Sequence, residues 1–229
     1  YIMALSKFNF NSFDVTSVAS TGLGFNASAN GFSTINPGAM TLIKTLTASS
    51  NSTLSFVHGS SDVVLDSTYP VYLFKFINIH PATNNTDFSF NASDDDSSHS
   101  YDVVKTTTTF DAFHKEDGGN QALNYKTGGG EDIAQGTGFQ ILTLDGGVGN
   151  NNDDNFNGEL FLFNPSSTTF VKHFFATTTH GYNASPAFVM NSYIAGYFNT
   201  TADITAIQFK FASGNIDAGT IKLYGIKDS

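Results

Sequence analysis

Short apolar runs separated by polar clusters characterise the chain from Thr41 onward. Thr, Val, Ile, Phe and Tyr dominate these runs, and Gly, Asn, Asp and Ser fill the stretches between them. No window shows apolar residues at the i, i+3, i+4, i+7 spacing of an amphipathic helix. β-Branched and aromatic residues favour strands, and frequent turn signals are typical of all-β folds. The pattern predicts an all-β, antiparallel β-sandwich with a jelly-roll-like arrangement.

The apolar runs give the expected strands. In 204–211, Ile207 and Phe209 share one face while Lys210 takes the other, and in 219–226 Ile221 opposes Lys222, so both strands are expected to be half-exposed. The expected strands are 41–47, 53–57, 70–79, 87–92, 101–110, 138–144, 158–163, 168–177, 187–198, 204–211 and 219–226.

Two polar turns are predicted to close antiparallel hairpins. ASSNS at 48–52 separates the first two expected strands, and SGNIDAG at 213–219 separates the last two. The loops at 94–100, 115–137 and 145–158 are longer and polar. Long loops in a compact domain are usually functional or mobile.

The stretch GELFLF, at 158–163, is apolar on both faces. Leu160 and Leu162 point to one side of a strand, and Phe161 and Phe163 point to the other. Because a two-layer sandwich buries only one face of each sheet, these four residues are candidates for the core or for a subunit interface. A homo-oligomer is therefore expected.

Residues 1–40 differ in composition from the body at 41–229. They are rich in Ser, Ala, Gly and Asn, and they carry the aromatic residues Phe8, Phe10, Phe13 and Phe25. We expect an extended N-terminal arm, which is either a loosely packed terminus or an arm that docks the body on a partner through these aromatic residues.

Charge and composition exclude several functions. The net charge is −10, and all ten basic residues are lysine. This argues against nucleic-acid binding, where Arg is the preferred residue, and against binding to anionic membranes. There is no cysteine, no run approaching 18 apolar residues and, in YIMALSKFNF, no charged and apolar signal-peptide pattern. We expect neither a transmembrane helix nor a signal peptide.

Motifs for catalysis are absent from the sequence. The three glutamates, Glu116, Glu131 and Glu159, form no pattern typical of glycosidases, and most aspartates lie in predicted turns. No nucleophile elbow, phosphate-binding loop or His-Glu-x-x-His zinc motif occurs, and the spacing of His173 and His180 matches no standard zinc site. The protein is expected not to be an enzyme and to need no cofactor.

Calcium is the one metal that the residues suit. Asp153, Asp154 and Asn155 lie together in NNNDDNFNG, and Asp94–Asp96 form a second acidic run. Both supply oxygen ligands, but neither matches an EF-hand loop. A solvated loop is the alternative interpretation of each.

Three stretches, in the same order, are similar to segments of bacteriophage virion proteins. VYLFKFINIHPATNNTDFSF resembles a strand–PAT(D/N)–strand unit, GELFLFNPSSTTFVKHFFATT with AFVMNSYIAGYF resembles a middle segment, and SGNIDAGTIKLYGI resembles a C-terminal segment of tail-appendage and capsid-decoration proteins of marine-type phages. The resemblance covers roughly 41–226. It implies a non-enzymatic component of the extracellular virion particle, an appendage, fibre, knob or decoration, that contacts other virion proteins and itself. We expect a homotrimer.

Two other functions stay open. A carbohydrate-binding sandwich, acting as a host receptor-binding module, could stack sugar rings on Tyr101, Tyr125, Tyr182 and Tyr193, although tryptophan is missing. A subunit of a cellular surface layer or filament would use the N-terminal arm as a donor strand.

Overall fold

The structure is a computed structural model that describes residues 22–25, 28, 32–35 and 38–227. Its regular elements in those ranges are all strands, as the sequence predicts. The chain divides into two compact units, Tyr1–Thr41 and Leu42–Ser229.

The first unit contains a short hairpin. β1 (Gly22–Phe25) pairs antiparallel with β2 (Phe32–Ile35), and the rings of Phe25 and Phe32 stack with their centroids 5.2 Å apart. The predicted docking residues Phe8, Phe10 and Phe13 lie outside the described residues, so the docking role of the arm stays a prediction.

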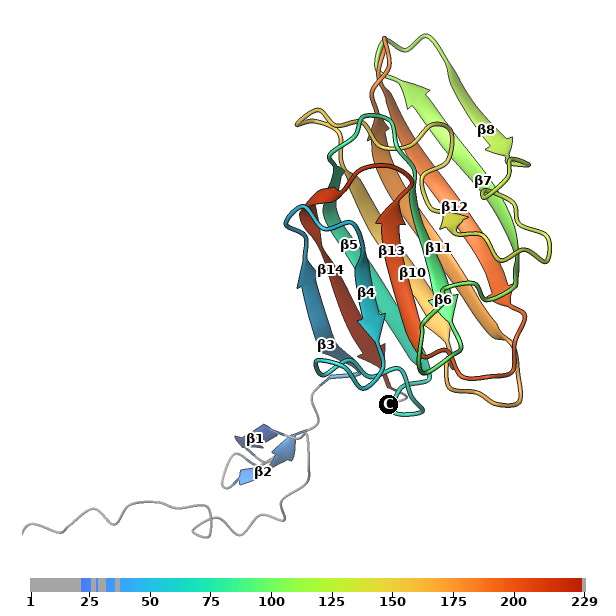
Figure 1. Cartoon of the computed structure of the whole chain (residues 1–229). Helices are drawn as coiled ribbons and strands as arrows, with labels where there is room; N and C mark the ends of the chain where they lie inside the picture. Colours follow the sequence, from blue (N-terminus) through green and yellow to red (C-terminus); the bar gives the residue numbers. More distant parts are fainter. Residues whose placement is uncertain (1–21, 26–27, 29–31, 36–37, 228–229) are drawn as a thin grey trace, which may run out of the picture. The chain divides into compact units, whose positions relative to one another are not determined.

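The second unit is a sandwich of two sheets (Figure 1). The large sheet has the strand order β3 (Met40–Thr47), β14 (Ile216–Ile226), β5 (Val71–Pro81), β10 (Phe156–Phe163), β11 (Lys172–Tyr182), β12 (Phe188–Phe198), β7 (Lys105–Lys115), β8 (Gln121–Tyr125). The small sheet has the order β4 (Leu54–Val57), β13 (Ala206–Phe211), β6 (Phe88–Ser93), β9 (Gln140–Ile141). The β-sandwich prediction is confirmed, and the jelly-roll connectivity stays a prediction.

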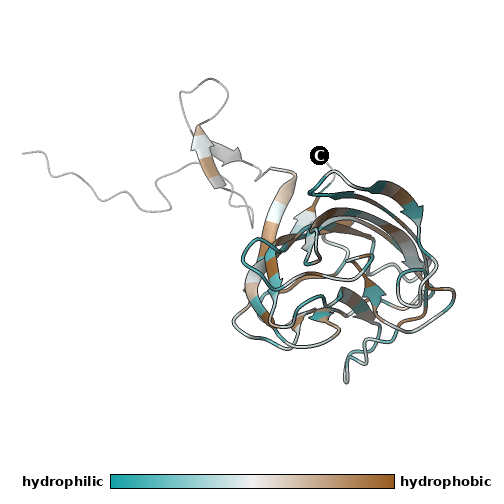
Figure 2. Cartoon of the chain, turned by 90° about the horizontal axis from the view of Figure 1, so that it is seen from above, coloured by the Kyte–Doolittle hydropathy of each residue, from teal (hydrophilic) through white to brown (hydrophobic). Residues whose placement is uncertain are grey.

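Figure 2 shows the two sheets from above as two layers. Aromatic side chains fill the space between these sheets. Phe209 of the small sheet is fully buried, and its ring centroid lies 5.4 Å from that of Phe74 and 5.2 Å from that of Phe76 in the large sheet. Phe90 similarly meets Phe174 across the layers, with centroids 5.1 Å apart. The expected alternation in 204–211 and 219–226 is confirmed, because Ile207, Phe209, Ile221 and Leu223 are buried and Lys210 and Lys222 are not.

Loops cover the part of the inward face that the narrower small sheet leaves open. The backbone N–H of Thr107 donates to the carbonyl of Ile133, and the Thr178 hydroxyl donates to the carbonyl of Leu142 at 2.7 Å. The long polar loops therefore contribute to the covering layer of the sandwich as well as to its surface.

Two buried lysines hold the connecting segments at one end of the large sheet. Lys172 donates to the carbonyls of Thr200 and Ala202, and Lys105 donates to the carbonyl of Gly138 at 2.6 Å. Burial lowers the pKa of the Lys105 ammonium to about 8, against the opposing effect of Asp102. The acceptor residues Gly138 and Ala202 are exposed, so these hydrogen bonds tie surface segments to lysines whose stems are buried under the sheet.

Both predicted hairpins are wrong. The turn at 48–52 connects β3 of the large sheet to β4 of the small sheet, and the turn at 212–215 connects β13 of the small sheet to β14 of the large one. Instead of closing hairpins, the two turns lie side by side, since the N–H of Asn51 donates to the Ile216 carbonyl and the N–H of Ile216 donates to the Asn51 carbonyl. Turn residues predict where the chain reverses but not which strand it joins.

Several strand boundaries also differ from the predictions. β7 begins at Lys105 rather than at 101 and runs on to Lys115, and β8 lies inside the stretch predicted as a loop at 115–137. The expected strand at 138–144 is reduced to the two residues of β9. Long-range pairing, rather than local propensity, decides these ends.

Candidate functional site

The two faces of β10 lie in different environments. Leu160 and Leu162 are fully buried in the core between the sheets. Phe161 and Phe163 alternate with them, point to the outward side of the large sheet and are half-buried. Of the four candidate interface residues, the structure therefore places the leucines in the core and leaves the phenylalanines on a surface.

The outward phenylalanines of β10 have an aromatic neighbour on the next strand. Phe161 lies directly opposite Phe175 of β11, and their rings stack at 4.8 Å with an angle of 21° between the planes. The ring of Phe163 lies 5.9 Å from that of Phe175, which is 41% exposed. Cross-strand aromatic pairs of this kind stabilise a sheet even on a face that is exposed to solvent.

A second aromatic row crosses the outer strands of the same sheet. Phe110 of β7 lies opposite Tyr193 of β12, and their rings stack at 4.7 Å with 11° between the planes. On the edge strand β8, Tyr125 lies opposite Phe110 and is 59% exposed. We call this surface the aromatic face; its members are Phe110, Tyr125, Phe161, Phe163, Phe175, Tyr193 and Tyr197.

A shallow apolar depression of about 390 Å³ lies within the aromatic face. Phe163, Phe175 and Tyr197 contribute to its lining, and the small side chain of Ala195 lies among them. His173 contacts Tyr197, with ring centroids 5.7 Å apart. The face is thus hollowed where β12 carries a small residue between two large ones.

The aromatic face carries no formal charge at its outer strands. The outward positions of β7, β8, β11 and β12 hold no Asp, Glu or Lys, in a chain whose net charge is −10. The nearest ion pair on this side is Lys75–Glu159 at 3.3 Å, on β5 and β10. A second copy approaching the outer strands β7, β8, β11 and β12 would therefore meet no like charges there.

The structure separates the tyrosines that the sugar-binding hypothesis groups together. Tyr125 and Tyr193 flank Phe110 in one row of the aromatic face. Tyr182 ends β11 on the inward side, and Tyr101 lies near His99 in the segment before β7. Only Tyr125 and Tyr193 are brought together by the fold.

The candidate calcium ligands at 153–155 line one pocket with Glu116 and His180, but they differ in exposure and in partners. Asp153 is exposed, Asp154 is only 6% exposed, and the Asn155 amide oxygen accepts from the Asn157 side chain. Burial and the neighbouring Asp153 raise the pKa of Asp154. In the described ranges, no group of three or more His, Asp or Glu side chains could hold a metal ion.

The other acidic run uses its central carboxylate within its own loop. Asp95 accepts backbone N–H groups from Ser100, Ser98 and His99, and these hydrogen bonds hold its pKa well below the usual range. Such a carboxylate already has its acceptor sites occupied by the loop.

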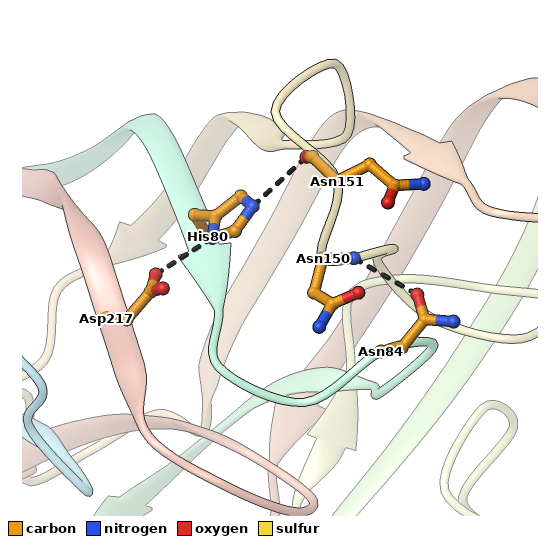
Figure 3. Close-up of polar contacts among 5 residues, drawn as sticks. All are labelled: His80, Asn84, Asn150, Asn151 and Asp217. Carbon is orange, nitrogen blue, oxygen red and sulfur yellow. Dashed lines mark hydrogen bonds and ion pairs between the residues drawn. The ribbon is translucent and has the colours of Figure 1, made fainter.

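Side-chain hydrogen bonds hold the loop at 145–155 against the ends of the core strands (Figure 3). His80 lies between Asp217 of β14, 2.8 Å from its Oδ1, and the backbone carbonyl of Asn151, 3.1 Å away. The side-chain oxygen of Asn84 accepts the N–H of Asn150 at 3.1 Å. The loop is therefore fixed at Asn150 and Asn151 by contacts with Asn84 and His80.

A buried charge cluster lies on the inward side of β7, where the sequence predicted none. Asp111 is fully buried, and the ammonium of Lys126 lies 3.4 Å from its Oδ1 and 2.5 Å from Oδ2 of Asp145. Burial raises the pKa of Asp111 despite Lys126. Burial also opposes the charge on Lys126, but Asp145 and Asp111 outweigh it and raise the pKa of the ammonium.

His180 lies beside this cluster and predicts a pH dependence. It is 2% exposed, and burial lowers the pKa of its imidazole to about 4, although the Leu144 carbonyl and Asp145 favour the protonated ring. Between about pH 6.5 and 4, the unfolded chain binds a proton that the folded chain does not, so stability falls as the pH falls. His180→Gln cannot bind that proton. We expect it to lose about 2 kcal/mol less stability than the wild type between about pH 7 and 4.5.

Urea unfolding at the two pH values, followed by far-UV circular dichroism, measures this difference. Equal losses of stability in the two proteins would show that His180 titrates normally in the folded state.

No protein-family model, no curated protein and no solved structure matches this chain. Among the described residues, no helix is long and apolar enough to cross a membrane.

Proposed function

We propose that this protein is a non-enzymatic structural component of a phage virion that self-associates through its aromatic face. The observation that carries the proposal is the pair of stacked aromatic rows on an outward sheet surface whose strands β7, β8, β11 and β12 carry no Asp, Glu or Lys at outward positions. Contiguous exposed apolar surface of this kind is typical of interaction sites. The sequence resemblance over roughly 41–226 supports the virion assignment.

A second copy is the simplest occupant of the face. A standard interface buries about 800 Å² on each partner. Burial of apolar area contributes ~25 cal/mol per Å². This contribution exceeds the free-energy costs of association only when large, rigid side chains fill the centre of the interface. Aromatic residues are enriched at such centres, and the charged residues depleted there are absent from the outward positions of β7, β8, β11 and β12. We propose a homotrimer.

Light scattering on the purified full-length protein tests self-association. A wild-type trimer is expected, and Phe175→Ser and Tyr193→Ser are expected to give folded monomers, because both rings lie outside the core and are 41% and 38% exposed. A shortened chain that begins at Thr41 should remain a trimer if the body alone makes the contacts.

Phe170→Ser is the matched control. Phe170 is 73% exposed in the connection between β10 and β11, outside the aromatic face, so its replacement should leave the oligomer unchanged. A monomeric wild type, or trimers that persist in both face variants, would overturn the proposal of self-association. Antibody labelling of purified phage particles separates a virion component from a subunit of a cellular filament or surface layer.

Sugar binding on the aromatic face is less well supported. Each ring of the pairs Phe110–Tyr193 and Phe161–Phe175 has one face covered by its partner, at 4.7 and 4.8 Å. A sugar platform needs free ring faces, whereas interdigitation with another protein surface also uses ring edges.

A further inference from the structure

A pocket of about 230 Å³ lies at the end of the large sheet where β7 and β11 end and β12 begins. These strand ends are at the top of Figure 1. Tyr182, Phe188 and Lys115 occupy one inward-facing row across these three strands. Phe113 lies one row deeper, and the loop residues Asn120 and Asp145 complete the rim. The pocket is separate from the aromatic face, which is on the outward side.

Aromatic rings form the apolar wall of this pocket. The ring centroid of Phe188 lies 5.6 Å from that of Tyr182 and also 5.6 Å from that of Phe113. The ammonium of Lys115 lies 5.0 Å from the centroid of Phe188. All three rings are only partly buried, so they offer apolar surface to a ligand.

The carboxylate of Asp145 is the polar group of the pocket, and an ion pair with Lys126 holds it in position. Oδ2 of Asp145 binds the ammonium of Lys126, which is itself fixed by the buried Asp111. The backbone N–H of Asp145 donates to Oε1 of Glu131 at 3.3 Å. The Asp145 side chain nevertheless stays 43% exposed, so it presents an oriented carboxylate at the pocket.

The backbone at Asp145 makes a tight turn of three residues with positive φ. Asp145, Gly146 and Gly147 all have positive φ, at 62°, 115° and 81°. A Cβ on Gly146 would lie 2.8 Å from the Tyr182 ring, so this turn packs directly against the pocket wall. Glycine adopts positive φ without cost and aspartate tolerates it, so the Asp-Gly-Gly sequence allows this close turn against the pocket wall.

The charges around the pocket favour a neutral ligand. Lys115 and Lys126 lie with three carboxylates, Asp111, Asp145 and Glu131, which leaves no excess positive charge for an anion. The Lys115 ammonium over the Phe188 ring disfavours a cation on the apolar wall. The chain's overall charge of −10 further disfavours anions. Apolar rings facing a few fixed hydrogen-bonding groups are typical of small-molecule sites, and this volume is below the roughly 300–1,000 Å³ of drug-sized pockets.

We propose that this pocket binds one neutral sugar residue. The C–H face of the pyranose packs on Tyr182 and Phe188, its hydroxyls donate to Asp145, and the Asn120 amide donates to a ring hydroxyl. The site adds ligand recognition to a protein proposed to be structural, and it does not depend on self-association, because none of its residues belongs to the aromatic face.

Saturation-transfer NMR with the methyl glycosides of glucose, galactose, mannose and N-acetylglucosamine tests the site. At least one should bind the full-length protein with a Kd on the order of 1 mM, as expected for so small a ligand. Asp145→Asn should weaken binding about tenfold, because the sugar hydroxyls then donate to a neutral amide oxygen in place of a charged carboxylate. Tyr182→Ala should abolish the signal.

Tyr125→Ala is the matched control, since Tyr125 is an exposed tyrosine of the aromatic face. It should leave sugar binding unchanged, and thermal unfolding should show that all variants are folded. Absence of binding by all four glycosides, or loss of binding in Tyr125→Ala but not in Tyr182→Ala, would overturn the proposal. Light scattering on the same samples reports self-association separately.

Discussion

Replacing Lys126 with Met is expected to lower the free energy of unfolding by about 3–5 kcal/mol at neutral pH. Lys126 is 8% exposed and is the cation beside Asp111, which is fully buried, at 3.4 Å. Methionine fills a similar length of side chain but leaves the Asp111 carboxylate without a counter-charge. Removing one partner of a buried pair is costly because the remaining ion keeps its desolvation penalty.

The loss should depend on pH in a defined direction. In the Lys126→Met variant, the pKa of Asp111 in the folded state rises further above its value in the unfolded chain. A raised carboxyl pKa destabilises the folded state at pH values above the unfolded pKa of about 3.9, and this cost increases until the pH passes the folded pKa. The variant should therefore be closest to the wild type in stability at acidic pH.

Two comparisons separate this mechanism from a packing defect. Asp111→Asn combined with Lys126→Met removes both charges at nearly constant shape, and it should recover most of the loss. Lys75→Met breaks the exposed Lys75–Glu159 pair and should cost at most about 1 kcal/mol. Urea unfolding gives all four free energies; a double variant no more stable than Lys126→Met alone would contradict the electrostatic explanation.

Local alternation predicts burial well wherever one face of a strand meets the core. The spacing of Ile207, Phe209 and Ile221 predicts that they point inward, and all three are buried. The period of two in a strand is a local property, so it needs no knowledge of the partner strand. The same alternation predicts that Phe161 and Leu162 point to opposite sides of the sheet, which identifies Phe161 as part of the aromatic face.

Pairing between strands could not be predicted in this way. β14 lies between β3 and β5 in the large sheet, although the turn that precedes it looks like a hairpin turn. The stacking of Phe161 on Phe175, and of Phe110 on Tyr193, depends on registers set by the whole sheet. Local sequence specifies a turn, but the core decides which strands pair.

The buried charge cluster of Asp111, Lys126 and Asp145 was not predicted from the sequence, because it also depends on contacts between distant segments. The sequence predicts that a strand ends at Phe110, just before Asp111, whereas β7 continues to Lys115. An aspartate at an inward position of a longer β7 is the signal that could have revealed the cluster. Lys126 and Asp145 reach it from segments that the sequence presents as solvated loops.

Replacing Phe209 with Ala is expected to be the most destabilising single change in the core, at about 3–5 kcal/mol. Its ring centroid lies 5.2–6.3 Å from those of five other phenylalanines, which come from both sheets: Phe56, Phe74, Phe76, Phe88 and Phe90. Because close-packed aromatic neighbours cannot collapse into the space that the ring leaves, the cavity term adds to the lost burial.

The effect is measured by urea unfolding followed by far-UV circular dichroism, since the chain has no tryptophan for fluorescence. A loss of this size is a large part of the stability of an ordinary domain, so Phe209→Leu, with an expected cost of about 1–2 kcal/mol, provides a variant that stays folded. Phe170→Ala removes an equally large ring that is 73% exposed, and it should change stability by less than about 0.5 kcal/mol. Similar losses for Phe209→Ala and Phe170→Ala would mean that Phe209 is not at the centre of the packed layer between the sheets.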